Sequence, residues 1–226
     1  MCGRYTIITD VSDLAEDFGA EVDSAFQAKP RYNVAPSQTV PVIAVQEGKR
    51  ILQGMHWGLV PFWAKEKSIG YKMINARSET IAEKPAFKQA LLKRRCLLLA
   101  DGFYEWRKDG AVKTPMWIRL KNEEPFLLAG LWESWHPPDD RESTLLSTTI
   151  ITTAANDFMK PIHDRMPVIL SKKDAEAWLD ESIKDAAKLT RYLNPFPAEA
   201  MTAHPVSILV NSPKNDRPEC IEPAAY

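Results

Sequence analysis

The chain has few cysteines, and their positions give no pattern of cross-linking. Three cysteines stand among 226 residues, at positions 2, 96 and 220, an odd number without the short spacings of a zinc site or a disulfide framework. The four histidines are too scattered along the sequence to indicate a metal site. We therefore expect no structural disulfide and no bound metal, as is usual for a protein in a reducing compartment.

Long apolar runs are also missing. The longest runs, at 96–100 and 126–131, fall well short of the roughly 20 apolar residues that a membrane-spanning helix needs. No basic and then apolar leader precedes the first segment that is expected to fold. We expect a soluble cytoplasmic protein that does not bind membranes, associated with the nucleoid if its source is bacterial.

Positive charge is not in excess. The 29 lysines and arginines are balanced by 30 aspartates and glutamates, for a formal net charge of -1. This balance excludes a protein that coats nucleic acid through its overall charge, but it leaves room for a local basic groove. The cations that could form such a groove are Arg4, Arg31, Arg77, Lys93, Arg94, Arg95 and Arg165.

Length and composition predict one α+β domain over residues 1–226. The chain is 45% apolar and shows no internal repeat, low-complexity tract or long linker. Alternating or β-branched runs predict a mainly antiparallel sheet with strands at 40–45, 50–57, 96–106, 116–120, 126–132, 145–153, 168–170 and 206–210. Helical spacing predicts short helices at 10–18, 82–95, 174–179 and 183–193. The proline-rich segment from about residue 211 predicts an irregular tail.

Cys2 differs from the other cysteines because loss of Met1 would make it the N-terminal residue. It would then carry an amine and a thiol on adjacent carbons, which can condense with an aldehyde to an imine and close to a thiazolidine. The amine is a usable nucleophile near neutrality because its reference pKa is about 7.7 to 8.0, against about 10.4 for lysine. Taken alone, a cysteine at position 2 is more often an incidental residue of a frayed end.

Three polar residues stand where apolar or aromatic runs meet loops. Asn75 follows an apolar pair, Glu105 lies among aromatic residues, and His163 precedes the apolar run 168–170. Each has an ordinary structural explanation, as a turn former, a surface residue of an alternating strand or a buried histidine. Together they are candidates for a site built at the ends of strands. Cys96, inside an apolar run, is expected to be buried and inert.

Seven short motifs follow one another along nearly the whole chain. They are MCGRY at 1–5, RYNVAP at 31–36, WGLVP at 57–61 with Trp63, NARSET at 75–80, ADGFYEW at 100–106, HDRMP at 163–167, and HPVS at 204–207 with Val210 and Asn211. With these motifs the chain resembles the SOS response associated peptidases, also called abasic site processing proteins. It departs from their pattern at Tyr5 and Leu99, where phenylalanine and proline are common. The resemblance implies a barrel-like β core flanked by short helices.

The resemblance also implies a covalent chemistry. Cys2, once N-terminal, would form a thiazolidine crosslink with the ring-opened abasic sugar of single-stranded DNA and shield the lesion. Carried over position by position, Asn75 would orient the N-terminus or the sugar, while Glu105 and His163 would move protons. The proton steps are opening of the sugar and loss of water from a carbinolamine. Release of Met1 or of a longer N-terminal extension would be the peptidase activity, and strand cleavage by elimination stays open.

Other residues of the motifs suit contacts with DNA. Arginines next to catalytic positions can hold phosphates in fork geometry, and exposed indole rings can stack on bases for about 1 to 3 kcal/mol each. The expected DNA-binding residues are Arg4, Asn33, Pro36, Trp63, Arg77, Trp106 and Arg165. We expect the protein to act on abasic single-stranded DNA as a monomer, with no cofactor.

Two other functions remain open at this point. A thiol, a histidine and a carboxylate also support acyl transfer, so Cys2, His163 and Glu105 could belong to a cysteine peptidase that processes its own N-terminus or other proteins. Alternatively, arginines and tryptophans could bind single strands without forming a bond. Covalent adduct formation that depends on Cys2 distinguishes the first function from both.

Overall fold

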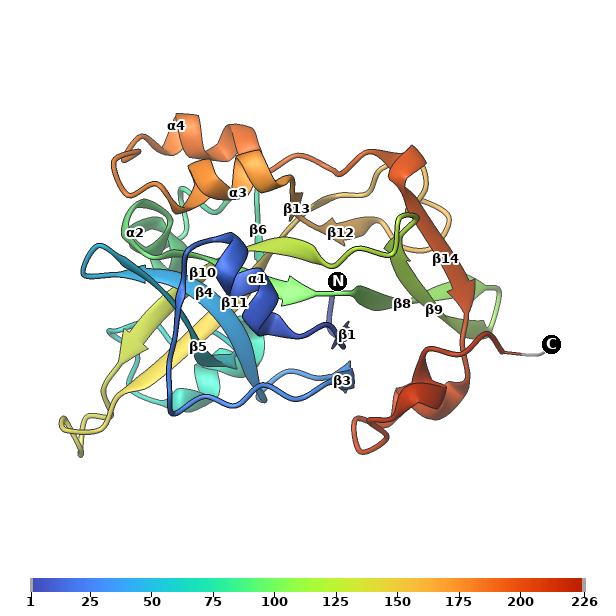
Figure 1. Cartoon of the computed structure of the whole chain (residues 1–226), viewed down its shortest axis with the longest axis horizontal. Coiled ribbons are helices and arrows are strands. Elements are labelled where there is room, and N and C mark those ends of the chain that lie inside the picture. Colours follow the sequence, from blue (N-terminus) through green and yellow to red (C-terminus); the bar gives the residue numbers. More distant parts are fainter. Residues whose placement is uncertain (1, 225–226) are drawn as a thin grey trace.

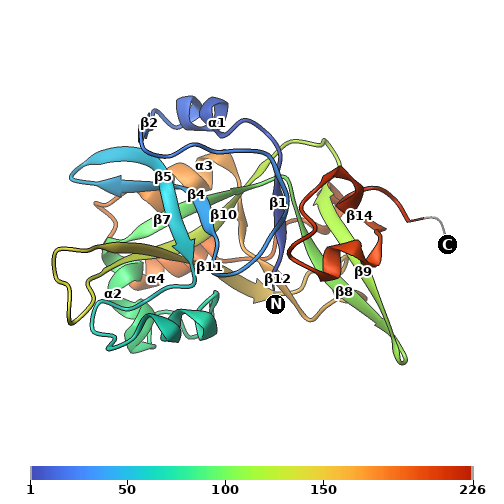
Figure 2. The same ribbon diagram turned by 90° about the horizontal axis from the view of Figure 1, so that it is seen from below.

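Two β-sheets form the frame of the molecule (Figure 1). The structure is a computed structural model, and it describes residues 2–224. Met1, whose removal the proposed chemistry requires, and residues 225–226 lie outside the described part. One sheet has the strand order β12-β11-β10-β7-β4-β5-β2, and the other has the order β14-β9-β8-β1-β3. Several helices are short, and they pack on the outside of the sheets (Figures 1 and 2).

The larger sheet closes on itself. Its ring consists of β4 (Thr39–Gln46), β5 (Lys49–Trp57), β7 (Arg95–Ala100), β10 (Phe126–Trp135) and β11 (Leu145–Ala154). Neighbours in the ring are antiparallel except β11 and β5, which pair in parallel through Ser147 with His56 and Thr148 with Trp57. The ring strands carry buried apolar side chains on both faces, with Leu98 and Leu128 opposite each other on one face and Ile43 opposite Leu97 on the other. The expected α+β fold with a barrel-like, mainly antiparallel core is therefore confirmed.

Short strands extend this sheet at its edges. They are β2 (Glu21–Val22), β6 (Asn75–Arg77), β12 (Arg165–Pro167) and β13 (Ile169–Leu170). β6 and β12 both pair with the end of β11, where Thr152 is opposite Arg77 on one side and Pro167 on the other. Two of the sequence motifs are thereby brought to neighbouring positions.

The smaller sheet contains both ends of the fold. Its strands are β1 (Tyr5–Ile7), β3 (Arg31–Val34), β8 (Gly102–Asp109), β9 (Val112–Leu120) and β14 (Met201–Pro205). β1 lies between β8 and β3, with Tyr5 opposite both Phe103 and Val34. β1 is thus paired on both edges and fully buried, and Cys2, three residues before its start, is buried as well.

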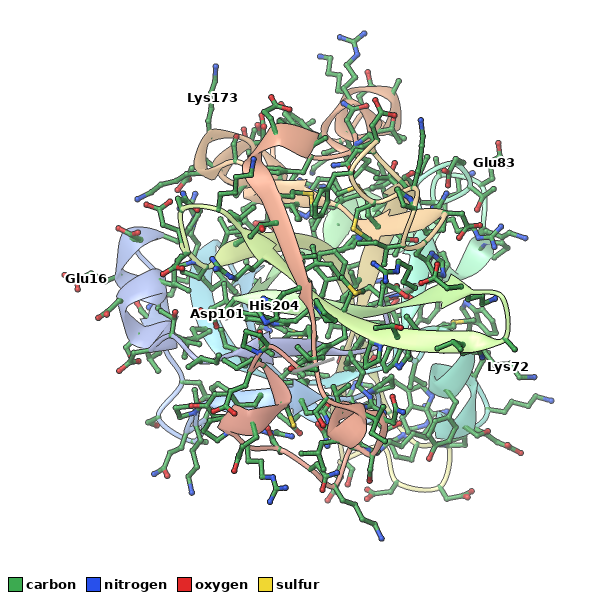
Figure 3. All side chains as sticks on the ribbon, turned by 90° about the vertical axis from the view of Figure 1, so that its right-hand side faces the viewer. Glu16, Lys72, Glu83, Asp101, Lys173 and His204 are labelled. Atoms are coloured by element: carbon green, nitrogen blue, oxygen red, sulfur yellow. The ribbon has the colours of Figure 1, made fainter. Side chains whose placement is uncertain are left out.

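The prediction of one strand over 96–106 is wrong, because the chain changes sheets at Asp101. Its carboxylate accepts hydrogen bonds from the backbone N–H groups of Ile8 and Thr9, which fixes the turn. The next residue, Gly102, has no room for a side chain, since a Cβ there would lie 2.3 Å from Nε1 of Trp117. Figure 3 labels Asp101 in a view from the side on which β14, with His204, crosses the molecule. β8 thus leaves the barrel and carries Glu105 into the second sheet.

Helix ends follow local capping chemistry. α1 (Val11–Asp17) begins after Asp10, whose carboxylate accepts from the N–H of Ser12, and the chain turns at Gly19 with a φ of 56°. α2 (Pro85–Lys93) begins at its proline rather than at residue 82, and it ends before 95 because Arg95 enters β7. α3 (Lys172–Leu179) is capped by Ser171. The helix expected at 183–193 is shorter, α4 (Ala186–Leu189) followed by the 3₁₀ turn Thr190–Tyr192.

The prediction of a strand at 206–210 is also wrong. The strand in this region is β14, which ends at Pro205. Ile208–Asn211 forms a 3₁₀ turn, and the Ser207 hydroxyl at its start accepts a hydrogen bond from the N–H of Leu209. Further 3₁₀ turns lie at Lys67–Lys72, Ala198–Ala200 and Pro218–Cys220. Among residues 2–224, no helix combines the length and the apolar character that crossing a membrane requires.

Candidate functional site

An open cavity of about 490 Å³ lies beside β8. It is lined by Glu105, Trp106, Lys108, Lys113, His163 and Asn211. These residues come from β8 and β9, from the loop before β12 and from the turn after β14, segments far apart in the sequence. The cavity brings Glu105 and His163 together, as the sequence predicts for catalytic partners.

Glu105 is a carboxylic acid held almost out of contact with water. It is 4% exposed, between the buried Tyr104 and the half-buried Trp106 on β8. Burial raises the pKa of Glu105 above its ordinary value, and the nearby His163 acts in the opposite direction. A carboxyl of this kind exchanges protons closer to neutral pH than an exposed glutamate, which suits an acid and base catalyst.

His163 is fixed at the rim of the cavity by its own loop. Its backbone N–H donates to the carbonyl of Met159 at 2.9 Å, and its Nε2 lies 3.9 Å from Oε2 of Glu105. Its Nδ1 lies 3.0 Å from the backbone N–H of Arg165 and 2.8 Å from Oδ1 of Asp164. When Nδ1 carries no proton it can accept from the N–H of Arg165, and when it carries one it can donate to the carboxylate of Asp164. Nδ1 therefore has a hydrogen-bond partner in either case.

Cys2 is completely buried in this structure. Burial raises the pKa of its thiol far above the ordinary value, and the negative charge of Glu105 raises it further. The Cys2 thiol is therefore held in its neutral form, with Glu105 as an electrostatic neighbour. Cys96 is also buried, as expected, and burial raises its thiol pKa to about 12.

Asn75 lies on β6, where it pairs in register with Ile150 of β11. Its Nδ2 donates to the carbonyl of Ile74 at 3.0 Å, while its Oδ1 is buried and has no hydrogen-bond partner among the described residues. A buried amide oxygen without a partner is uncommon, and it is available to accept a hydrogen bond from a ligand. Asn75 does not line the cavity beside Glu105.

The three arginines expected at the site have different surroundings. Arg4 donates to Oδ1 of Asn33 at 2.7 Å and to the carbonyl of Val210 at 2.6 Å, so it ties the N-terminal segment to the tail. Arg165 is bonded to both carboxylate oxygens of Glu79. Arg77 is exposed, and within residues 2–224 its side chain forms no hydrogen bond or ion pair.

The remaining residues of the expected DNA-binding set also differ in exposure. Asn33 is fully buried, and its Nδ2 donates to the carbonyls of Ser212 and Asn215, so a direct side-chain contact with DNA is closed to it. Pro36 is half-buried, and Trp63 is 49% exposed. Trp106 lines the cavity, with its Nε1 donating to Oδ1 of Asn211 at 2.7 Å.

Sequence reasoning did not select three residues that line the cavity, Lys108, Lys113 and Asn211. Lys108 stands two residues after Trp106 on one strand, which puts both on the same face and was a usable signal. Lys113 lies beside Lys108 only because the hairpin turn brings β9 back along β8. In the described part of the chain, no three His, Cys, Asp or Glu side chains are grouped so that they could hold a metal ion.

The family model described as "SOS response associated peptidase (SRAP)" matches residues 1–213. The chain belongs to this family. Among its relatives, abasic site processing protein YoqW of Bacillus subtilis is 46% identical over 226 residues, covering 98% of this chain and 99% of that protein. Abasic site processing protein HMCES of Xenopus tropicalis is 38% identical over 226 residues, covering 85% of this chain and 66% of that protein.

Solved structures of the same fold are also known. The crystal structure of a protein from Bacteroides thetaiotaomicron superposes with a TM-score of 0.90, at 30% identity, over 99% of this chain and 100% of that one. A protein from Bordetella bronchiseptica superposes with a TM-score of 0.76, at 25% identity, over 92% of this chain. This chain therefore shares its fold with proteins whose structures have been solved.

Proposed function

We propose that this protein processes abasic sites in single-stranded DNA by forming a covalent crosslink through Cys2. Its membership in the SOS response associated peptidase family and relatives that are named abasic site processing proteins support the substrate. The observation that carries the chemistry is the juxtaposition of Glu105 with both His163 and the Cys2 thiol. We expect the protein to work in the cytoplasm as a monomer, without a metal ion or cofactor.

The first step needs the amine of Cys2, which removal of Met1 would release. The amine attacks the aldehyde carbon of the ring-opened sugar, and the carbinolamine that forms loses water to give an imine. Glu105 accepts a proton from the attacking nitrogen and returns one to the departing hydroxyl. Because burial raises the pKa of the Glu105 carboxyl, this group holds a proton up to a higher pH than an exposed glutamate, which suits it to both accepting and returning a proton.

The second step closes the ring. The thiol sulfur adds to the imine carbon, its proton passes to the nitrogen, and the products of the whole sequence are a thiazolidine and one water. The thiol is neutral before this step because burial raises its pKa, so it needs a base as it attacks. Glu105 is the charged neighbour of that thiol, and we assign the proton transfer to it.

His163 and Asn75 would act on the sugar. Opening of the cyclic sugar removes a proton from the C1′ hydroxyl and gives one to the ring oxygen, and His163 stands at the cavity with a partner for either proton state. The unpartnered Oδ1 of Asn75 would accept a hydrogen bond from the amine or from a sugar hydroxyl. These contacts would hold the aldehyde in line with the nitrogen of Cys2.

The DNA contacts divide into direct and indirect ones. Arg77, Trp63 and Trp106 are accessible, so we assign phosphate binding to the arginine and base stacking to the indoles. We assign Pro36, half-buried after β3, to the same surface. Arg4 and Asn33 would support the surface from below by holding the tail in place. Arg165 would bind a phosphate only by giving up its ion pair with Glu79.

The test is incubation of the protein, with Met1 removed, with an oligonucleotide that carries one abasic site. We expect an adduct that survives denaturation, with an intact mass equal to protein plus DNA minus one water. Cys2→Ala should abolish it, whereas Cys96→Ala, the matched loss of a buried thiol, should retain it if the variant folds. Absence of the adduct from the wild-type protein would overturn the proposal. Repeated cleavage of peptides in trans, indifferent to DNA, would favour a general peptidase instead.

A second activity of the same residues is release of the N-terminal residue before Cys2. The thiol of Cys2 and the pair Glu105 and His163 are the groups that acyl transfer would use. Mass measurement of freshly expressed wild-type, Cys2→Ala and Glu105→Gln chains tests this. Loss of Met1 from all three variants alike would attribute its removal to the host cell and not to this site.

A further inference from the structure

Two lysines stand directly opposite each other on the β8–β9 hairpin. Lys108 pairs in register with Lys113, one step from the turn that Asp109 and Val112 close. Across a two-residue turn the closing pair is hydrogen bonded, so the next pair is not, and its opposing Cβ atoms approach to about 4.5 to 5.5 Å. Two ammonium groups on one face at this spacing repel each other.

Neither lysine is paired with a carboxylate in the described part of the chain. Both side chains are exposed, and neither forms a hydrogen bond or ion pair with any residue of 2–224. The nearest carboxylate along the strand, Asp109, accepts from Nε of Arg107 at 3.0 Å instead. Like charges at opposite positions destabilise a β pair, and an anion bound between them reverses the sign of that interaction.

The lysine pair and the candidate site share one surface. Lys108 and Lys113 line the cavity together with Glu105, Trp106 and His163. Trp106 precedes Lys108 by two residues, so the indole and the lysine pair follow one another along the same face of the hairpin. Figure 2 shows the hairpin projecting from the body of the molecule, and both lysine side chains are exposed.

We propose that Lys108 and Lys113 bind a backbone phosphate of single-stranded DNA on one side of the lesion, beyond the base that stacks on Trp106. This inference rests on the proposed function and adds the path of the strand, which would leave the cavity along the hairpin toward its turn. Lysine carries a compact charge with three donors, which suits phosphate contacts that are independent of base sequence. With a net charge of -1, the chain depends on such local cations to attract DNA.

The first experiment measures binding of lesion-free oligonucleotides at several salt concentrations, which needs no crosslink. In single strands each neutralised phosphate contributes about 0.7 to the slope of log K against log salt. We expect Lys108→Gln/Lys113→Gln to reduce the slope by about 0.7, the contribution of one phosphate, and to weaken binding at low salt. Lys108→Arg/Lys113→Arg should keep the wild-type slope.

The matched control is Lys173→Gln/Lys188→Gln, with the same change of charge on exposed lysines of α3 and α4. In Figure 3, Lys173 points into solvent at the side of the view away from the hairpin tip. An unchanged slope in the Lys108 and Lys113 variant, or an equal loss in the control variant, would overturn the inference. The control variant should melt at the temperature of the wild-type protein, and the Lys108 and Lys113 variant should melt at that temperature or slightly above it, because it loses the repulsion between the two lysines.

The second experiment identifies the side of the lesion. Oligonucleotides with the abasic site at the 5′ end or the 3′ end keep only one flank each. At subsaturating DNA, the double glutamine variant should crosslink more slowly with one of the two, and equal rates with both would contradict a one-sided path. If the wild-type protein forms no adduct, the proposed function fails while the salt slope still tests the lysines. If the adduct forms and the slope is unchanged, only this inference fails.

Discussion

Nε2 of His163 lies 3.9 Å from Oε2 of Glu105, and both residues line a cavity to which several separate segments of the chain contribute. Glu105 is held by β8 in the smaller sheet, whereas His163 belongs to the loop between β11 and β12 of the barrel. The separation exceeds a direct hydrogen bond and leaves both groups within reach of a substrate oxygen placed between them. Movement of one sheet against the other would therefore change the distance on which proton transfer depends.

The stability of the protein should depend on pH through Glu105. Burial raises its pKa in the folded state, so folding favours the protonated form, and stability from this group is lost as pH rises from about 4.3, the ordinary glutamate pKa, through the raised value. Glu105→Gln keeps the shape without the charge, and it should be more stable relative to wild type at pH 8 than at pH 5.

Melting temperatures at the two pH values test this expectation. Glu83→Gln is the control, because it removes an exposed carboxylate with the same change of charge. A difference between wild type and Glu105→Gln that stays constant with pH would show that the folded-state pKa is not raised. Crosslinking by Glu105→Gln should be slow at both pH values.

Arg4 and Arg77 should separate stability from binding. Arg4→Ala removes charged hydrogen bonds to Asn33 and to the carbonyl of Val210, and we expect a loss of about 1.5 to 3 kcal/mol in the free energy of unfolding. Arg77 is exposed, so Arg77→Ala should change stability by less than about 0.5 kcal/mol while weakening DNA binding. Urea denaturation and oligonucleotide titration measure the two effects. Equal losses of stability in both variants would contradict the assignment.

Glu79 should compete with DNA for Arg165. The hydrogen bond from Arg165 lowers the pKa of Glu79, so the pair stabilises the fold above the ordinary glutamate pKa and is lost as pH falls through the lowered value. Because Glu79 is half exposed, the pair contributes at most about 1 kcal/mol. Glu79→Gln should therefore fold normally, free the guanidinium and increase the salt slope of binding by about 0.7.

Glu83→Gln is again the matched control, since it makes the same change of charge four residues away. If both variants bind DNA equally, the effect is one of net charge and Arg165 has no part in binding. If only Glu79→Gln binds more tightly, the exchange of carboxylate for phosphate is supported.

Gly102→Ala should disturb the turn that carries β8 into the second sheet. The added Cβ would lie 2.3 Å from Nε1 of Trp117 and 2.9 Å from the carbonyl oxygen of Ile118, and overpacking of this kind costs about 1 to 3 kcal/mol. Trp117→Phe removes the indole nitrogen, so the double variant should lose less stability than the two single losses together. Strict additivity in denaturation experiments would show that this contact does not limit the turn.

The sequence by itself determined most of the local structure. The β-rich runs at 40–45 and 50–57 became β4 and β5, and the helices expected at 10–18 and 82–95 became α1 and α2 with shorter bounds. These features depend on backbone geometry and on neighbours a few residues away, which periodicity and capping record directly. The order of the seven motifs likewise pointed to the family that the family model matches.

Only the tertiary structure decided what the polar residues meet. Arg4 and Asn33 carry side chains typical of DNA contacts, yet their closest partners are the carbonyls of a tail some 180 to 200 residues later in the chain. The break at Asp101 and the opposition of Lys108 and Lys113 depend in the same way on Trp117 packing and on the hairpin register. Hydrogen bonds and charge pairs act over a few ångströms in space, and sequence patterns carry no record of such distances once the segments are far apart.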